Sequence, residues 1–192
     1  MLSQIFISTL QILSAFYLTI VLLRFLLQLA RADFYNPISQ FVVKATNPLV
    51  IPLRKVIPGL GGIDLATLVL ALILQMIVFI LILLAAGITA INPLQVLAWS
   101  FITLLALVSK IYFWSILAVI ILSWVSQGSY HPAVMLLYQL TEPIMAPFRK
   151  LLPTMGGLDL SPILVFLVLN VVDIVIHYMA MRVGLPSIGV GF

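Results

Sequence analysis

The sequence predicts an all-α integral membrane protein with four transmembrane helices, arranged as two tandem parallel repeats that are each a helical hairpin. Hydrophobic residues make up 64% of the 192 residues and charged residues only 7%, with a mean hydropathy of +1.31, which is outside the range of soluble domains. Several uncharged runs are long enough to cross a hydrocarbon core, which takes about 20 helical residues. The second half of the chain also repeats the first at an offset of 95 residues.

Two uncharged runs predict the membrane spans of the first repeat, residues 1–95. The first run continues past Arg24, so we predict a span over residues 5–30. The second run predicts a span over residues 65–91. Asp64 stands directly before it, and an aspartate side chain there can accept a hydrogen bond from an unpaired backbone amide, so we expect it to cap the helix.

The spans of the second repeat, residues 96–192, each contain charged residues. Lys110 divides the span predicted over residues 97–125 into two uncharged pieces, which leaves open one long helix or an interfacial helix followed by a shorter span. The span predicted over residues 160–182 contains Asp173 and His177, so hydropathy alone does not establish it. The repeat register lays both segments over the two spans predicted for the first repeat, and therefore favours one main span in each.

A proline-rich basic motif recurs in the loop of each hairpin, over residues 31–64 and residues 126–159. Between Pro37 and Leu65, 11 of 29 positions are identical at the repeat offset. The motif residues of the first repeat are Thr46, Pro48, Pro52, Arg54 and Lys55, and those of the second are Thr141, Pro143, Pro147, Arg149 and Lys150. Because proline is tolerated in a first helical turn, its positions predict two short amphipathic helices in each loop.

The basic residues indicate the orientation of the chain in the membrane. Both motif loops carry basic residues and the other loop and the N-terminus carry none, so both motif loops should be cytoplasmic and both termini outside. We expect the short helices to lie in the headgroup region, where Arg54, Lys55, Arg149 and Lys150 contact anionic lipid. A docking surface for a cytoplasmic protein is the alternative interpretation of these basic pairs.

The two copies of Thr-x-Pro-x-x-x-Pro-x-Arg-Lys, each followed by Pro and Gly-Gly-x-Asp-Leu, resemble the motif of the YggT family of small bacterial and plastid membrane proteins. The two-unit form is similar to the proteobacterial inner-membrane type. The resemblance implies processes as different as osmotic and potassium tolerance, cell division, nucleoid distribution and cofactor assembly in plastids. It implies no catalytic residues.

A stripe of polar residues marks the last predicted span. Asn170, Asp173 and His177 follow one another at intervals of three and four residues and so share one helix face. Such residues are costly in a membrane, which makes the stripe a candidate for an ion or proton path, whereas the structural alternative is hydrogen bonding between helices. Gln75 occupies the position equivalent to Asn170. Depth along the helices predicts an ion pair between Lys110 and Asp173.

These observations predict a non-enzymatic protein of the bacterial inner membrane, because no nucleophile elbow, Gly-rich phosphate loop or metal-ligand spacing is present. We expect a scaffold or assembly factor whose basic cytoplasmic motif docks lipid or protein, with no cofactor, no metal and no direct nucleic-acid partner. We also expect a homo-oligomer or a place in a larger membrane complex. The alternative is a small ion-conducting or transport-modulating protein in osmotic or potassium homeostasis.

Overall fold

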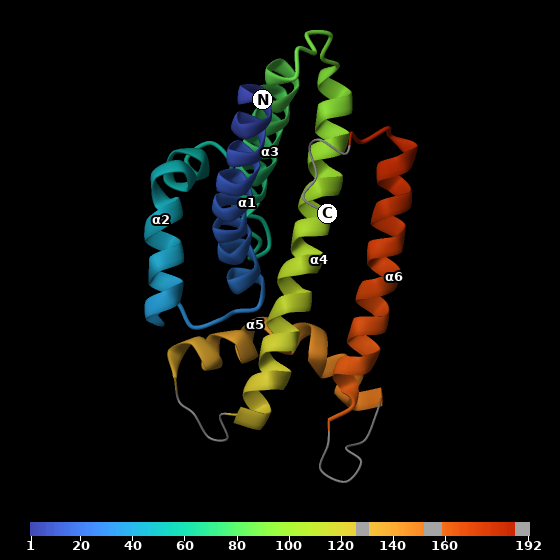
Figure 1. Cartoon of the computed structure of the whole chain (residues 1–192). Coiled ribbons are helices and arrows are strands. Elements are labelled where there is room, and N and C mark those ends of the chain that lie inside the picture. The colour runs from blue at the N-terminus through green and yellow to red at the C-terminus, as the bar shows by residue number, and fades with distance from the viewer. Residues whose placement is uncertain (126–130, 152–158, 187–192) are drawn as a thin grey trace.

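The computed structural model describes residues 1–125, 131–151 and 159–186, which form six α-helices (Figure 1). Four of them are long and apolar enough to cross a membrane: α1 (Leu2–Leu29), α3 (Leu65–Ala85), α4 (Pro93–Val125) and α6 (Ser161–Arg182). The other two, α2 (Pro37–Arg54) and α5 (Pro132–Leu151), carry the repeated motif and are amphipathic. The prediction of an all-helical chain with four candidate spans is confirmed.

The segment around Lys110 is a single helix, because α4 continues without a break from Pro93 to Val125. Leu104 and Ala106 before the lysine, and Ile111 and Ile116 after it, are buried against neighbouring helices. The helix thus packs against its neighbours both before and after Lys110. The one-helix alternative is therefore correct.

The prediction of two short helices in each motif loop is wrong, because α2 and α5 are continuous helices with two prolines inside each. In α2, Val42, Thr46 and Val50 are buried at intervals of four residues. One buried face therefore continues across Pro48. Packing of that face holds the helix together although the proline removes one backbone hydrogen bond.

The first turn of α2 and α5 follows the predicted pattern. Proline is the first helical residue of both, and the residue before it caps the helix: the Asn36 side chain accepts a hydrogen bond from the Ile38 amide at 2.9 Å. At the equivalent position of the second repeat, Nδ1 of His131 accepts from the Ala133 amide at 3.2 Å. An asparagine and a histidine thus perform the same local task in the two repeats.

Helix α3 ends earlier than the predicted span over residues 65–91. Gly87 has a φ of +80°, and the Ile88 amide donates to the Leu83 carbonyl at 2.9 Å, while the Gly87 amide donates to the Leu84 carbonyl at 3.0 Å. This is a Schellman ending, in which a glycine in the left-handed region closes the helix. The uncharged residues after it form the turn into α4, which hydropathy cannot distinguish from a span.

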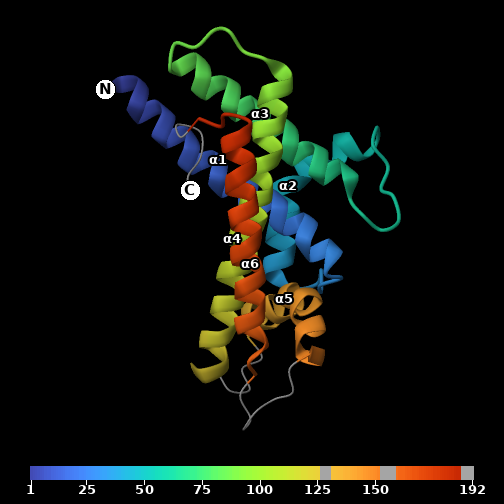
Figure 2. The same ribbon diagram turned by 90° about the vertical axis from the view of Figure 1, so that its right-hand side faces the viewer.

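The two repeats have matching internal contacts. Helix α1 packs on α3 with α2 against both, and α4 packs on α6 with α5 against both. The repeats meet mainly through α3 and α4, with further contacts between α2 and α5 and between α1 and α4. Figure 2 shows the α1–α3 hairpin inclined relative to α4 and α6, and Figure 1 shows α5 running crosswise near the lower ends of α4 and α6. The parallel orientation of the repeats in a membrane stays a prediction.

Candidate functional site

An arginine–aspartate ion pair recurs at equivalent positions of the two repeats. Arg54, at the end of α2, donates to both carboxylate oxygens of Asp64, with 3.3 Å between Arg54 Nε and Asp64 Oδ1. Arg149, near the end of α5, donates to Asp159 with 3.1 Å between Nε and Oδ2. Each pair joins the end of a motif helix to the start of the next membrane span. We call these pairs the Arg–Asp clasps.

The carboxylate of the first clasp also caps α3, as the sequence predicted. Asp64 accepts hydrogen bonds from the amide and the hydroxyl of Thr67. Burial alone would raise the pKa of the Asp64 carboxyl, but the hydrogen bonds from Arg54 and Thr67 and the charge of Arg54 outweigh it and hold the pKa below its ordinary value. The Asp64 side chain is only 3% exposed, against 43% for Arg54. The clasp is thus half-buried.

The second clasp is more open. The Asp159 and Arg149 side chains are both 37% exposed, and Asp159 accepts from the Ser161 amide at 2.9 Å. Burial would raise the pKa of Asp159, but its bonds to Ser161 and Arg149 outweigh burial and lower the pKa. Arg149 also donates to Glu142, two turns earlier on the same helix, at 2.7 Å and 3.0 Å. A second carboxylate therefore shares the arginine of this repeat.

The first repeat instead has a buried arginine on the membrane helix α1. Nη1 of Arg24 donates to Thr46 Oγ1 at 2.7 Å, to Asn47 Oδ1 at 2.9 Å and to the Val43 carbonyl at 3.4 Å, all on α2. Thr46 in turn donates to the Val42 carbonyl at 2.7 Å. Arg24 is only 4% exposed and fastens α2 to α1.

Thr141 of the second repeat is buried like Thr46 and donates to the Leu137 carbonyl at 2.9 Å, one turn back on its own helix. Its repeat has Val119 at the position of Arg24, so no guanidinium reaches it there. Pro52 and Pro147 lie exposed inside α2 and α5. The threonines thus belong to the interior of the motif and the prolines to its surface.

The two motif lysines differ from the arginines beside them. Lys55 and Lys150 are exposed, and neither side chain makes a hydrogen bond or an ion pair with another residue in the described part of the chain. Lys44, on α2, is also exposed. The two residues of each basic pair therefore differ: the arginine forms an ion pair with an aspartate, and the lysine side chain is exposed.

The intramembrane polar residues occupy different environments. Gln75 on α3 is buried, whereas the stripe of Asn170, Asp173 and His177 is exposed on α6. The reason is position: α3 contacts α1, α2 and α4, while α6 lies at the edge against α4 and α5. The two amides are equivalent in the repeat but not in burial. In a single chain the stripe is therefore largely exposed, although Asp173 also contacts α4.

Asp173 is approached from α4 by Ser109, whose hydroxyl donates to Oδ1 at 2.6 Å. The described residues form three ion pairs, the two clasps and Arg149 with Glu142, and the predicted Lys110–Asp173 pair is not among them. The physical reason is helix geometry. Successive residues point about 100° apart, so Ser109 facing α6 turns Lys110 elsewhere.

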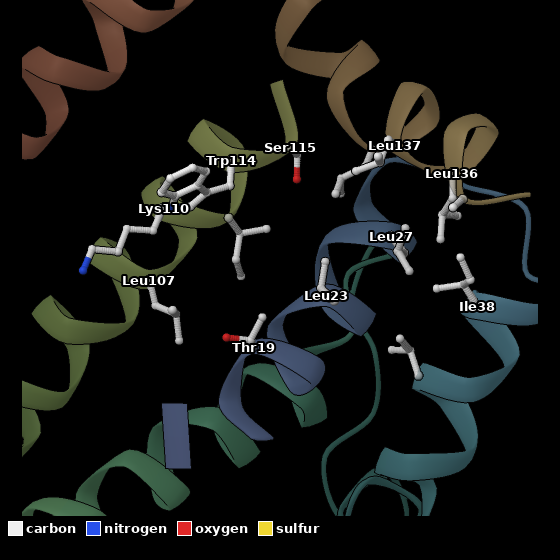
Figure 3. A pocket seen from close by; sticks show the side chains of 14 residues that line it. Thr19, Leu23, Leu27, Ile38, Leu107, Lys110, Trp114, Ser115, Leu136 and Leu137 are labelled. Carbon is white, nitrogen blue, oxygen red and sulfur yellow. The ribbon is translucent and has the colours of Figure 1, made fainter. Parts of the chain in front are cut away.

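Lys110 lines a mainly apolar cavity of about 570 Å³ where the two repeats meet, between α1, α2, α4 and α5. Figure 3 shows Leu23 and Leu27 of α1 opposite Leu136 and Leu137 of α5, with the amino group of Lys110 leading away from these leucines. A second cavity, of about 520 Å³, lies in the first repeat and has a mixed lining, with the polar side chains of Arg24, Gln28, Arg54 and Asp64 beside apolar ones such as Phe34 and Val43.

Sequence reasoning missed the clasps and the role of Arg24. A signal for the clasps was present, since Arg54 and Asp64 are both among the positions that are identical in the second repeat. For Arg24 the signal was its position, a single arginine inside an otherwise uncharged run. Buried charges in such runs require polar partners, which the threonine and asparagine of the motif supply.

Comparison with known proteins agrees with this two-repeat organisation. The model of the CCB3/YggT family matches twice, over residues 3–85 and 98–180. An uncharacterised protein of Pseudomonas aeruginosa is 52% identical over 180 residues, which cover 93% of this chain and 91% of the relative. Uncharacterised protein YggT of Escherichia coli K12 is 43% identical over 157 residues, covering 82% and 81%. No solved structure matches. This chain is therefore a member of the CCB3/YggT family.

Proposed function

We propose that this protein is a non-enzymatic scaffold or assembly factor of the bacterial inner membrane, whose two motif helices dock an acidic partner on the cytoplasmic side. The observation that carries the proposal is that the two residues of each basic pair have different contacts. Arg54 and Arg149 hold the ends of α2 and α5 against the following spans, while Lys55 and Lys150 remain exposed beside them. The ion pair holds the helix end in place, so the exposed ammonium group beside it is positioned to bind a carboxylate or a phosphate.

Two partner chemistries suit these lysines, anionic headgroups and an acidic protein surface. Lipid alone would make the motif a membrane anchor, whereas a protein would make it a scaffold. The apolar neighbours Val56 and Leu151 are equivalent in the two repeats, and both are strongly exposed. They allow the partner to be captured without altering either lysine.

The test is photo-crosslinking in native membranes. A photoreactive amino acid replaces Val56 or Leu151 of the full-length protein, and the masses of the cross-linked products are measured by mass spectrometry. We expect a protein adduct of the same mass at both sites, lost in the Lys55→Gln, Lys150→Gln variant. The matched control, Arg31→Gln with Lys44→Gln, removes two other exposed cations and should keep the adduct. Lipid adducts alone at both sites would overturn the scaffold role.

The second candidate is an ion-conducting or transport-modulating protein, and the exposed stripe on α6 favours it. An exposed carboxylate such as Asp173 is costly against lipid, so a second copy of the chain or a water-filled path would face it in the membrane. In this candidate function, Asp173 lines the path together with Asn170 and His177. The homo-oligomer that we expect would supply the opposite wall.

A further inference from the structure

The guanidinium of Arg24 is a buried cation whose hydrogen-bond partners are all neutral. Its partners are a hydroxyl, an amide oxygen and a backbone carbonyl, and it forms no ion pair within the described residues. Only Nη1 is engaged in these bonds, so Nε and Nη2 remain to donate elsewhere. A buried charge is costly unless a counter-charge accompanies it. Arg24 therefore has no anion bonded to it, and the nearby Asp64 carboxylate is already paired with Arg54.

The cavity of the first repeat is placed to receive an anion. It measures about 520 Å³, and Arg24, Gln28, Arg54 and Asp64 all reach it. Arg54 neutralises Asp64 through the clasp, which leaves the positive charge of Arg24 uncompensated. A monoanion therefore balances the cavity. The volume lies within the range of ligand sites in proteins, roughly 300–1,000 Å³.

The second repeat has a different arrangement of charges at the equivalent positions. Position 119, equivalent to Arg24, is a valine, and position 142, equivalent to Asn47, is a glutamate that pairs with Arg149. The second repeat thus carries its own carboxylate and no buried extra cation. The first repeat has the reverse combination, a buried cation beside a neutral asparagine. The missing anion is therefore specific to the first repeat.

The position of Arg24 along α1 indicates which kind of monoanion can reach it. It lies five residues before the end of α1 at Leu29, or about 8 Å along the helix axis at 1.5 Å per residue. If α1 spans the membrane, this is the level of the headgroup region and not of the hydrocarbon centre. We propose that the cavity binds a phosphodiester monoanion, the headgroup phosphate of one anionic phospholipid per chain, with Nε and Nη2 of Arg24 as its donors. The Gln28 amide already donates to the Gly62 carbonyl, and Arg54 donates to Asp64 and Gln28, so these two side chains form the wall of the cavity.

This site is separate from the docking surface proposed above. The docking proposal depends on Lys55 and Lys150, whereas the phosphodiester site depends on Arg24 and the interior of the first repeat. Loss of one therefore leaves the other testable. The probe is phosphatidylglycerol, and the measurement is native mass spectrometry of the full-length protein released from detergent. We expect one retained phosphatidylglycerol per chain, in preference to phosphatidylcholine.

The decisive variant is Asn47→Asp. It keeps the shape of the side chain and its bond to Arg24 but supplies the counter-charge from within the protein, as Glu142 does for Arg149. We expect retention of phosphatidylglycerol to fall at least about tenfold, the size of losing a charge-assisted contact, while the fold is unchanged or more stable. A purely structural role of Arg24 predicts no change in lipid retention. Arg24→Gln should lose the lipid as well, and a matched Lys44→Gln variant should keep it.

Two further arms distinguish the source of the phosphate. Inorganic phosphate or glycerol 3-phosphate added at millimolar concentration should not displace the lipid if the acyl chains contribute to binding. Displacement would mean that the site takes a soluble phosphate, and would overturn the lipid assignment. Unchanged retention in both Asn47→Asp and Arg24→Gln would overturn the site itself. Equal retention of phosphatidylcholine, whose headgroup also contains a phosphodiester, would overturn the assignment of an anionic lipid.

Discussion

Replacing Asp64 by asparagine should destabilise the protein more than the same change at Asp159. Asparagine also caps helices, so the bond to the Thr67 amide can persist and the change isolates the ion pair with Arg54. An exposed pair contributes about 0–1 kcal/mol, whereas removing one partner of a fully buried pair costs about 3–5 kcal/mol. Because Asp64 is 3% exposed but Arg54 is 43% exposed, we place the cost of Asp64→Asn between these limits, at about 1–2 kcal/mol.

The second clasp provides the internal control. Both Arg149 and Asp159 are 37% exposed, and Glu142 still pairs with Arg149 after Asp159→Asn, so this variant should cost at most about 0.5 kcal/mol. Thermal unfolding in one detergent measures both, and each kcal/mol corresponds to about 2–4 °C at this chain length. Equal shifts for the two variants, or a larger shift for Asp159→Asn, would show that burial of Asp64 does not strengthen its clasp.

Two further predictions follow from the same contacts. The lowered pKa of Asp64 means that its clasp contributes fully above the ordinary carboxyl pKa of about 3.9 and is lost as the pH falls through the lower folded value, so acid should reduce the melting temperature less in Asp64→Asn than in the unmodified protein. If Asp173 lines an ion path, Asp173→Asn should abolish an ion-dependent growth phenotype with unchanged membrane abundance; a drop in abundance would instead identify the carboxylate, which accepts from Ser109, as a structural group.

Much of the fold could be predicted from the sequence, because helix spans and helix caps depend on residues that are close together in the chain. Uncharged runs identify helices that suit a hydrocarbon solvent, and the capping role of Asp64 follows from one residue type at one position. The ends of the helices were less accessible. The Schellman ending at Gly87 depends on backbone geometry, and the uncharged residues after it have the hydropathy of a span.

The site was less predictable because it depends on contacts between distant residues. Pro48 indicated a helix start when only its missing amide was considered, but the buried face through Val42, Thr46 and Val50 holds one helix across it. Likewise, the sequence favoured an ion pair between Lys110 and Asp173 from depth alone. Depth says nothing about rotation around the helix axis, and one residue of rotation places Ser109 at Asp173 instead.

The two repeats differ in the charged residues around the shared motif. Both copies keep the arginine, the aspartate and the buried threonine, so the clasp and the interior of the motif are common to them. They differ in the charge that accompanies these groups: a cation on the membrane helix in one copy and an acid on the motif helix in the other. In a duplicated fold, one copy can diverge while the other keeps the architecture. The asymmetry at Arg24 and Glu142 therefore separates the contacts that both copies share from those of the anion site proposed for the first repeat.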